Sequence, residues 1–371
     1  MTKYCPDLFQ NLYIQKLNEN ESTLGYCCVS QTSDPVTKIT IDDSFLVDGR
    51  QHFIDTGQLP PACQRCTDLE NVGVDSRRIQ LRATNHDSSN KAAALKSIHY
   101  NCDPICNLKC IVCSSQWSSS WIDDDLKLGR TVQTKIRHTK HNTLAWDLDF
   151  KEVEMIYFNG GEPLASRDHI NLLNKVIESG TAHDISVIYN TNATIPVTAE
   201  ALMLWSKFRS VTLMCSIDAT HAAFEYIRFP AKWQQVTDNI QSYLDTKLEN
   251  VFVTITPNLG VHNILYLGDL LEWANDNSLP VRVQDTSGNL SLSNFPVHLK
   301  LALVDYMNSL TQHYDNANLL TELVKSIDNP DLAWLHWLNS LDQLRNNNWR
   351  ESLSKLYQLD SKFFDTWYQD H

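Results

Sequence analysis

Three cysteines, Cys106, Cys110 and Cys113, follow one another with the spacing C-x3-C-x2-C. Three thiolates in one loop can hold a four-iron cluster and leave its fourth iron without a protein ligand. A substrate or cofactor can bind at that iron, which makes the loop a candidate reactive centre. Zinc also binds cysteine thiolates, and in that alternative the fourth ligand would come from Cys102, His99 or a more distant residue.

A second candidate functional segment, Asn159-Gly160-Gly161-Glu162-Pro163, lies downstream of the cysteine loop. It comes directly after the apolar run 153–158, whose composition predicts a strand. Two glycines at a strand end let the backbone come close to a ligand, and Glu162 adds a carboxylate. We therefore expect this segment to bind a cofactor beside the cysteine loop.

Strand-like runs alternate with helix-like sequence between residues 94 and 290. This alternation predicts an α/β fold with a parallel sheet, and six such strands fit a partial TIM-type barrel, (β/α)6. Reactive groups in such folds gather at the carboxyl ends of the strands, where the cysteine loop, the glycine pair, Asn190, Asn192, Ser216 and Asp218 fall. The predicted strands are residues 94–101, 153–158, 185–189, 210–217, 251–256 and 281–284.

Taken together, these motifs resemble those of the radical S-adenosylmethionine enzymes, and most closely the group with a twitch or SPASM-like auxiliary domain. The resemblance implies that Cys106, Cys110 and Cys113 hold a [4Fe-4S] cluster whose open iron binds S-adenosylmethionine. It also implies that the reduced cluster cleaves this cofactor to a 5′-deoxyadenosyl radical, which abstracts hydrogen from a substrate.

The same resemblance assigns residues to S-adenosylmethionine. The Gly-Gly-Glu-Pro motif would hold the methionyl amine, and Asn192 lies in a segment similar to the family's Thr-Asn-Gly-Thr strand end, with Ala193 in place of the usual glycine. Two further side chains, those of Ser216 and Arg228, resemble groups that bind the ribose and the carboxylate of S-adenosylmethionine in that family. The cofactor-binding residues implied in this way are Gly160, Gly161, Glu162, Asn192, Ser216 and Arg228.

Residues 1–90 contain a second group of cysteines, Cys5, Cys27, Cys28, Cys63 and Cys66. The C-x2-C pair at 63 and 66 can share one metal, and a hairpin predicted within residues 8–26 would bring Cys5 near Cys27. Four such thiolates fit either a second four-iron cluster or zinc. The resemblance favours an auxiliary [4Fe-4S] cluster, and Cys27 over Cys28 as its ligand. Disulfides are a third alternative, against which the lack of a signal-peptide pattern argues.

The composition limits the classes of partner. With 31 basic and 44 acidic residues, the chain has a net charge of −13, which argues against non-specific binding to nucleic acid. No apolar run is long enough to span a bilayer, and we expect a cytoplasmic protein. A basic stretch at residues 130–141 is expected to be a solvated helix face.

We expect three parts in the chain. Residues 1–90 would form the twitch-like auxiliary domain, residues 91–295 the partial barrel and residues 296–371 a helical region whose tryptophans and leucines pack in the core.

The sequence thus predicts an enzyme that uses S-adenosylmethionine and an external electron donor of the flavodoxin or ferredoxin type. By resemblance, the expected substrate is a ribosomally made peptide, with a carbohydrate or another small molecule as the alternative. The competing interpretation is a non-catalytic iron–sulfur or zinc protein that serves in binding or electron transfer. No catalytic acid or base stands out among the residues.

Overall fold

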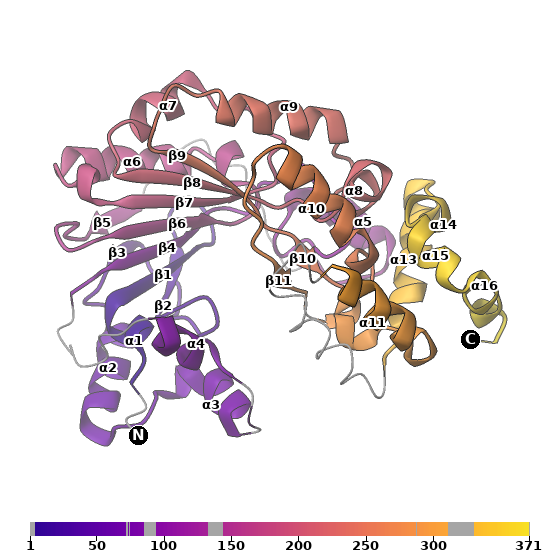
Figure 1. Cartoon of the computed structure of the whole chain (residues 1–371). Coiled ribbons are helices and arrows are strands. Elements are labelled where there is room, and N and C mark those ends of the chain that lie inside the picture. The colour runs from indigo at the N-terminus through magenta and orange to yellow at the C-terminus, as the bar shows by residue number, and fades with distance from the viewer. Residues whose placement is uncertain are drawn as a thin grey trace.

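The computed structural model describes residues 4–71, 73, 75–84, 94–132, 144–286, 288–310 and 330–370. Its central element is a seven-stranded sheet with the order β2-β1-β4-β6-β7-β8-β9 (Figure 1). β2 runs antiparallel to β1, and all other neighbouring strands are parallel. The strands are β1 (Asn11–Lys16), β2 (Ser22–Gly25), β4 (Ser97–Asn101), β6 (Met155–Asn159), β7 (Ser186–Thr191), β8 (Ser210–Cys215) and β9 (Val251–Ile255).

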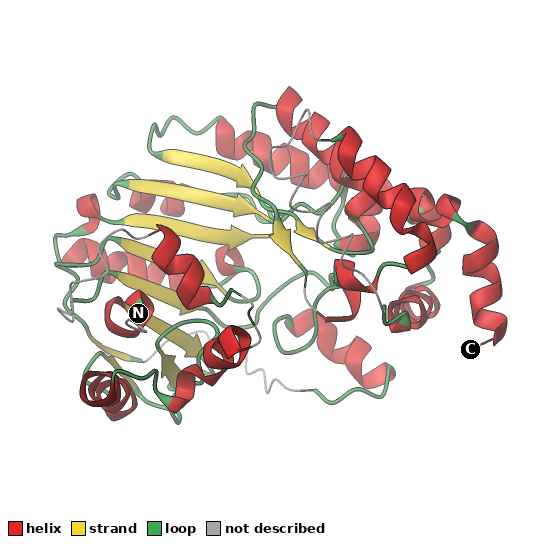
Figure 2. Ribbon diagram, turned by 60° about the horizontal axis from the view of Figure 1, so that its bottom comes forward, coloured by secondary structure: helices red, strands yellow, loops and turns green. Residues whose placement is uncertain are grey.

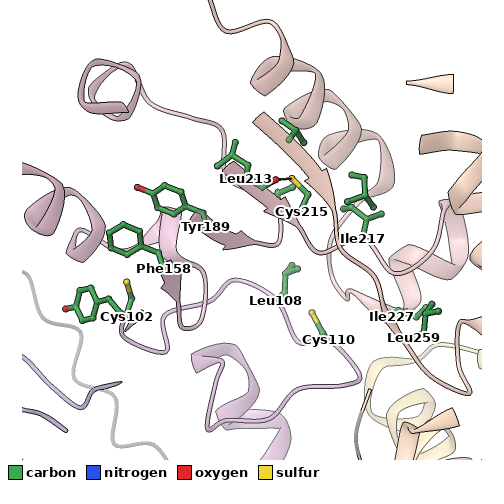
Figure 3. Packing of buried hydrophobic residues seen from close by; sticks show 14 of the residues in the cluster. Cys102, Leu108, Cys110, Phe158, Tyr189, Leu213, Cys215, Ile217, Ile227 and Leu259 are labelled. Atoms are coloured by element: carbon green, nitrogen blue, oxygen red, sulfur yellow. Dashed lines mark hydrogen bonds between the residues drawn. The ribbon is translucent and has the colours of Figure 1, made fainter. Parts of the chain in front are cut away.

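Large aromatic side chains fill one face of this sheet, since alternate residues of a strand point to the same face. The register places Tyr100, Phe158 and Tyr189 side by side on β4, β6 and β7, and all three are fully buried. The rings of Phe158 and Tyr189 stack with their centroids 4.9 Å apart (Figure 3). The Tyr189 hydroxyl accepts a hydrogen bond from the indole of Trp205 and also bonds the ring of His169. Helices α6 (Asp168–Glu178), α7 (Ala199–Trp205) and α9 (Trp233–Leu244) cover this side (Figure 1).

The opposite face of the sheet is polar and aromatic near the carboxyl ends of its strands. Tyr13, His99 and Tyr157 are neighbours across β1, β4 and β6. Their rings meet edge to face, with centroid distances of 5.2 Å and 4.9 Å. One step closer to the strand ends, Asn101 and Asn159 form the next pair in register. This face therefore places hydrogen-bonding side chains near the strand ends, whereas the other face is buried under helices.

Five of the six predicted strands are present, as β4, β6, β7, β8 and β9. The predicted sixth strand at residues 281–284 is present only in interrupted form. Val281 bridges to Ile255 in parallel, with backbone hydrogen bonds from Ile255 N to Pro280 O and from Arg282 N to Ile255 O. The chain then pairs as β11 (Gln284–Asp285) with β10 (Asn258–Leu259) in a separate two-stranded sheet. Pro257 follows β9 and Pro280 precedes Val281, and neither can donate a backbone hydrogen bond to extend the ladder.

The sixth parallel strand comes instead from the N-terminal hairpin. The predicted hairpin within residues 8–26 is present as β1 and β2, and β1 pairs with β4 from Asn11 to Gln15. Residues 1–90 and 91–295, which were expected to be separate domains, thus share one sheet. The α/β class with a parallel central sheet is confirmed, and the partial-barrel interpretation stays a prediction.

The C-terminal region 296–371 is helical where it is described. Its core packing is as predicted, because Trp334, Leu338 and Leu341 are fully buried. Most of the basic stretch 130–141 lies outside the described residues. No described helix has both the length and the apolarity needed to cross a membrane. The remaining elements are α1 (Pro6–Gln10), β3 (Lys38–Thr40), α2 (Ser44–Thr56), α3 (Gln64–Asn71), α4 (Arg77–Thr84), α5 (Ile122–Lys127), β5 (Ala145–Asp147), α8 (His221–Ile227), α10 (Leu267–Asp276), α11 (Lys300–Ser309), α13 (Ala333–Arg345), α14 (Trp349–Ser352), α15 (Ser354–Leu359) and α16 (Ser361–Asp370).

The parallel strands point towards the C-terminal helices (Figure 2), and α13 holds the cysteine loop in place. Trp337 of α13 stacks on Trp121 at 5.6 Å, and its indole donates a hydrogen bond of 2.9 Å to the carbonyl of Ile111. The guanidinium of Arg345 lies 4.7 Å from the centre of the Trp121 ring. The loop that carries Cys110 is therefore clamped by a helix far away in the sequence.

We expect Trp121→Ala to lower the free energy of unfolding by about 3–5 kcal/mol, because it empties a fully buried aromatic site between the loop and α13. Trp117→Ala is the matched control: that ring is 38% exposed, and its loss should cost less than about 1 kcal/mol. Urea unfolding followed by far-ultraviolet circular dichroism measures both. Equal losses in the two variants would contradict the clamp.

Candidate functional site

The cysteine loop leaves β4 and returns across the carboxyl ends of the parallel strands. Backbone hydrogen bonds attach it to the end of α8 and the residues that follow, from Lys109 N to Phe229 O (2.6 Å) and from Ile111 N to Ile227 O (2.9 Å). In the serine run after the loop, the Ser118 hydroxyl donates to the carbonyl of Leu108 at 2.6 Å, and a 3-10 helix at Ser119–Trp121 then leads into α5. Ser118 therefore connects the loop backbone to the start of this helix.

All three cysteines line one cavity of about 410 Å³. Cys110 is buried, and Cys106 and Cys113 are half-buried. Burial, followed by the charge of Cys110, raises the pKa of both Cys106 and Cys113 to about 12. Metal binding there must displace thiol protons, so loading would be favoured at higher pH.

Five of the six predicted cofactor residues line the same cavity. They come from the ends of three neighbouring strands, β6, β7 and β8, and from the segment after α8, and only Glu162 is missing from the lining. The structure thus brings together residues that are far apart in the sequence. The five are Gly160, Gly161, Asn192, Ser216 and Arg228.

The two glycines allow the cysteine loop itself to approach. Gly160 has φ = +126°, and a Cβ added there would lie 2.8 Å from the carbonyl oxygen of Cys102. A Cβ on Gly161 would lie 2.3 Å from the carbonyl oxygen of Ile105. The backbone of Gly161 donates to Asp103 O at 3.1 Å. The sequence suggested that these glycines let a ligand approach the backbone. The structure shows that they also let the cysteine loop approach.

Glu162 lies beneath the cavity wall, 1% exposed. Its carboxylate accepts hydrogen bonds from Leu164 N (3.0 Å), Thr191 Oγ1 (2.9 Å) and Asn192 N (2.6 Å). Burial raises the pKa of Glu162 to about 7, against the lowering effect of these hydrogen bonds. In this arrangement the carboxylate anchors the end of β7, and its contact with a methionyl amine stays a prediction.

Asn192 connects that anchor to the first cysteine. Its Nδ2 donates to Cys106 Sγ at 3.7 Å and to Asn107 Oδ1 at 3.0 Å, while its Oδ1 accepts from Thr194 N and Oγ1. Ala193 has φ = 57°, a left-handed conformation that favours glycine, the usual residue of the resembled family at this position. The turn therefore holds Ala193 in a conformation that glycine adopts more readily.

Arg228 joins the cavity to the second cysteine. Its Nε donates to Asp218 Oδ2 at 2.6 Å, and its Nη1 donates to Cys110 Sγ at 3.7 Å. Arg228 is 7% exposed and lines the cavity, and its Nη2 finds no hydrogen-bond partner among the described residues. A buried guanidinium with a free donor is suited to an acidic or hydrogen-bond-accepting group of a ligand.

A second, smaller cavity collects the predicted auxiliary cysteines, Cys5, Cys27, Cys63 and Cys66. All four are buried, and Arg77 and Arg78 lie in the same lining. Burial raises the pKa of Cys5 to about 12 and that of Cys27 to about 11. Four buried thiols in one cavity suit a metal centre held by thiolates, while Arg77 and Arg78 are paired with Asp7 and Glu70.

The free space among these four thiols is about 10 Å³, the size of a single water site. A four-iron cluster would therefore require the side chains to turn outward. Cys28, the alternative to Cys27, is exposed and lines the first cavity instead.

No group of three or more His, Cys, Asp or Glu side chains within the described ranges is arranged closely enough to hold one metal ion. A single zinc ion needs its ligands within about 2.0–2.3 Å of the metal, and so close to one another. The thiolates of a four-iron cluster bind separate irons, and their sulfurs lie further apart.

Two residues of the first cavity, Tyr13 and Asn101, were not identified from the sequence. Cys28 was considered only as an auxiliary ligand and His99 only as a zinc ligand. Burial, followed by Arg77, lowers the pKa of His99 to about 3, so it is neutral at physiological pH. Alternation along β1 and β4 could have indicated these positions had the N-terminal hairpin been placed in the main sheet. Cys102 and Cys215 are buried, as expected for packing cysteines.

The titration of Glu162 gives a test of its burial. Its pKa of about 7 exceeds the ordinary value of 4.5, so between these values the folded protein holds a proton that the unfolded chain releases. This group should therefore lower the free energy of unfolding by up to about 3 kcal/mol as the pH rises from 4.5 to 7, with no further change above.

Urea unfolding at a series of pH values, compared between the natural chain and Glu162→Gln, isolates this component from the buried histidines, which both proteins share. The glutamine variant should lack it. Identical pH dependence in the two proteins would mean that the carboxylate is not buried as described.

No family model matches the chain, and no curated protein matches it. Among solved structures, it is similar to anSMEcpe with bound AdoMet (14% identity, 58% of this chain and 62% of that chain, TM-score 0.40). It is also similar to Streptococcus suis SuiB bound to S-adenosylmethionine (12% identity, 81% of this chain and 68% of that chain, TM-score 0.35) and to SuiB bound to the precursor peptide SuiA (13% identity, 81% and 69%, TM-score 0.35). The chain spans about three fifths of anSMEcpe.

Proposed function

We propose that this chain is a radical S-adenosylmethionine enzyme that holds a [4Fe-4S] cluster through Cys106, Cys110 and Cys113. One observation carries the proposal: these thiols share a cavity of about 410 Å³ with five residues, far away in the sequence, that the resemblance assigns to the cofactor. When bound, the cluster would supply the electron that breaks a C–S bond of S-adenosylmethionine, giving methionine and a 5′-deoxyadenosyl radical that takes hydrogen from a substrate.

The residues around the cavity have distinct tasks in this proposal. Arg228, held by Asp218, offers its free Nη2 to an acidic group of the cofactor. Its Nη1 and the amide of Asn192 donate to the sulfurs of Cys110 and Cys106, and such hydrogen bonds tune the reduction potential of a cluster. Glu162 fixes Asn192 in the orientation that makes this possible.

An auxiliary [4Fe-4S] cluster is proposed at Cys5, Cys27, Cys63 and Cys66. Support comes from the shared lining of one cavity by four buried thiols. Zinc in the same thiols is the alternative that metal analysis must decide.

The side chains of the cavity wall are suited to bind a neutral substrate with hydrogen-bonding groups. Asn101, Asn159 and Asn190 line it with amide groups, Tyr13 adds a phenol, and His99 is neutral. Amide side chains pair well with peptide groups, since each offers both a donor and an acceptor. We propose a ribosomally made peptide as the substrate, with a carbohydrate as the alternative, and a flavodoxin- or ferredoxin-type protein as electron donor in the cytoplasm.

The activity has a direct test. Anaerobic reconstitution with iron and sulfide, followed by reduction with S-adenosylmethionine present, should yield 5′-deoxyadenosine, detected by liquid chromatography and mass spectrometry. Cys110→Ala should abolish the product, because it removes a cluster ligand. Cys215→Ala is the matched control, since that thiol is buried inside β8, and it should retain the product. A fully loaded cluster that forms no 5′-deoxyadenosine would support the non-catalytic electron-transfer alternative.

The auxiliary centre has its own test. Replacing Cys63 and Cys66 by alanine should halve the iron content, because one of two clusters is lost, and should leave 5′-deoxyadenosine formation without substrate largely intact. Cys27→Ala should lose the same iron, whereas Cys28→Ala should keep it, since the two neighbours line different cavities. Unchanged iron in the first variant would mean that these thiols hold zinc or no metal.

A further inference from the structure

Two adjacent cysteines after β2 serve different cavities. Cys27 is buried and lines the smaller cavity with the other three auxiliary thiols. Cys28 is exposed and lines the larger cavity together with Cys106, Cys110 and Cys113. Neither set of proposed metal ligands needs Cys28. It is therefore a fourth thiol in a cavity whose chemistry is accounted for by three.

Cys28 lies among side chains that line the proposed cofactor cavity. Its sulfur forms no disulfide and lies close enough to Tyr13 and Tyr157 to contribute to the raised pKa of both phenols, although burial is the larger cause. Arg228, nine-tenths buried, lines the same cavity with an unpartnered Nη2, which independently indicates that a ligand with acceptor atoms occupies this space.

We propose that Cys28 is a catalytic hydrogen-atom donor to carbon radicals formed in this cavity, an inference that rests on the proposed function. An S–H bond is weaker than an alkyl C–H bond, so hydrogen transfer from sulfur to a carbon radical is favourable. In the step, the S–H bond of Cys28 breaks, a C–H bond forms on the radical carbon, and the unpaired electron remains on sulfur. One electron from the external reductant and one proton from water restore the thiol.

This step defines the class of reaction that the cavity serves. A substrate radical quenched by Cys28 ends with a C–H bond and no new link to another atom. Hydrogen then arrives from the wall formed after β2, which can differ from the side on which it was removed. The substrate keeps its composition and changes its configuration at carbon, as in the inversion of an amino-acid residue within a peptide.

The test needs no substrate. The reconstituted protein is reduced with dithionite in D2O with S-adenosylmethionine and buffers whose C–H bonds are unlabelled. The Cys28 thiol exchanges to S–D, and the 5′-deoxyadenosyl radical should take this deuterium, giving singly deuterated 5′-deoxyadenosine by mass spectrometry. In Cys28→Ala and Cys28→Ser, the 5′-deoxyadenosine that forms should return to natural isotopic abundance.

Tyr13→Phe is the control, because the phenol of Tyr13 is another exchangeable hydrogen source in the lining, and its product should keep the deuterium. Loss of deuterium in Tyr13→Phe but not in Cys28→Ser would overturn the inference in favour of the phenol. If the natural chain gives unlabelled 5′-deoxyadenosine, the proposed role of Cys28 is overturned, while the proposed function stands. Absence of 5′-deoxyadenosine from the natural chain would instead contradict the proposed function, and the inference with it.

Discussion

The close contact between the backbone at the end of β6 and the cysteine loop is the constraint on which the rest of the site depends. Gly161 and Glu162 donate backbone hydrogen bonds to Asp103 and Ile105, the residues that lead into the first cysteine. Neither glycine has room for a side chain, because loop carbonyls occupy the space. Two backbones in van der Waals contact fix the height of the loop above the strands, and every thiol position follows from it.

A chain of hydrogen bonds extends this constraint across the sheet. Glu162, the residue after the glycines, binds the end of β7 through Thr191 and Asn192, and Asn192 returns to the sulfur of Cys106. On the other side, Asp218 after β8 holds Arg228, which reaches Cys110. Two buried carboxylates thus hold the two donors that face the sulfurs. Buried charges of this kind are costly unless fully bonded, which explains why each carboxylate has several donors.

The sequence predicts the parts of this arrangement that depend on local pattern. Apolar runs gave five strands correctly, and the spacing of Cys106, Cys110 and Cys113 identified residues that share a cavity. Contacts between distant segments left no such pattern. Nothing in residues 11–16 shows that they pair with β4, and nothing around Trp337 shows that it stacks on Trp121. Pairing and stacking are decided by the packing of the whole chain.

The proline pair around the predicted sixth strand is a different case, because the signal was present. Pro257 lacks a backbone donor, and it interrupts the parallel pairing that begins at the Ile255–Val281 bridge and continues in the β10–β11 ladder. The proline in the sequence therefore indicated an interrupted strand. Glu162 was identified by its type, but its place beneath the wall depends on partners from another strand.

Because Cys27 and Cys28 are adjacent, the lining of both cavities depends on the number of residues in the turn after β2. Successive α-carbons are about 3.8 Å apart, so the partition between the cavities is one residue thick at this point. A one-residue deletion between Gly25 and Cys27 would shift Cys28 into the place of Cys27 and leave the larger chamber with Val29, a side chain without transferable hydrogen. Length variation in this turn would therefore change the chemistry of both centres at once, although no ligand had been mutated.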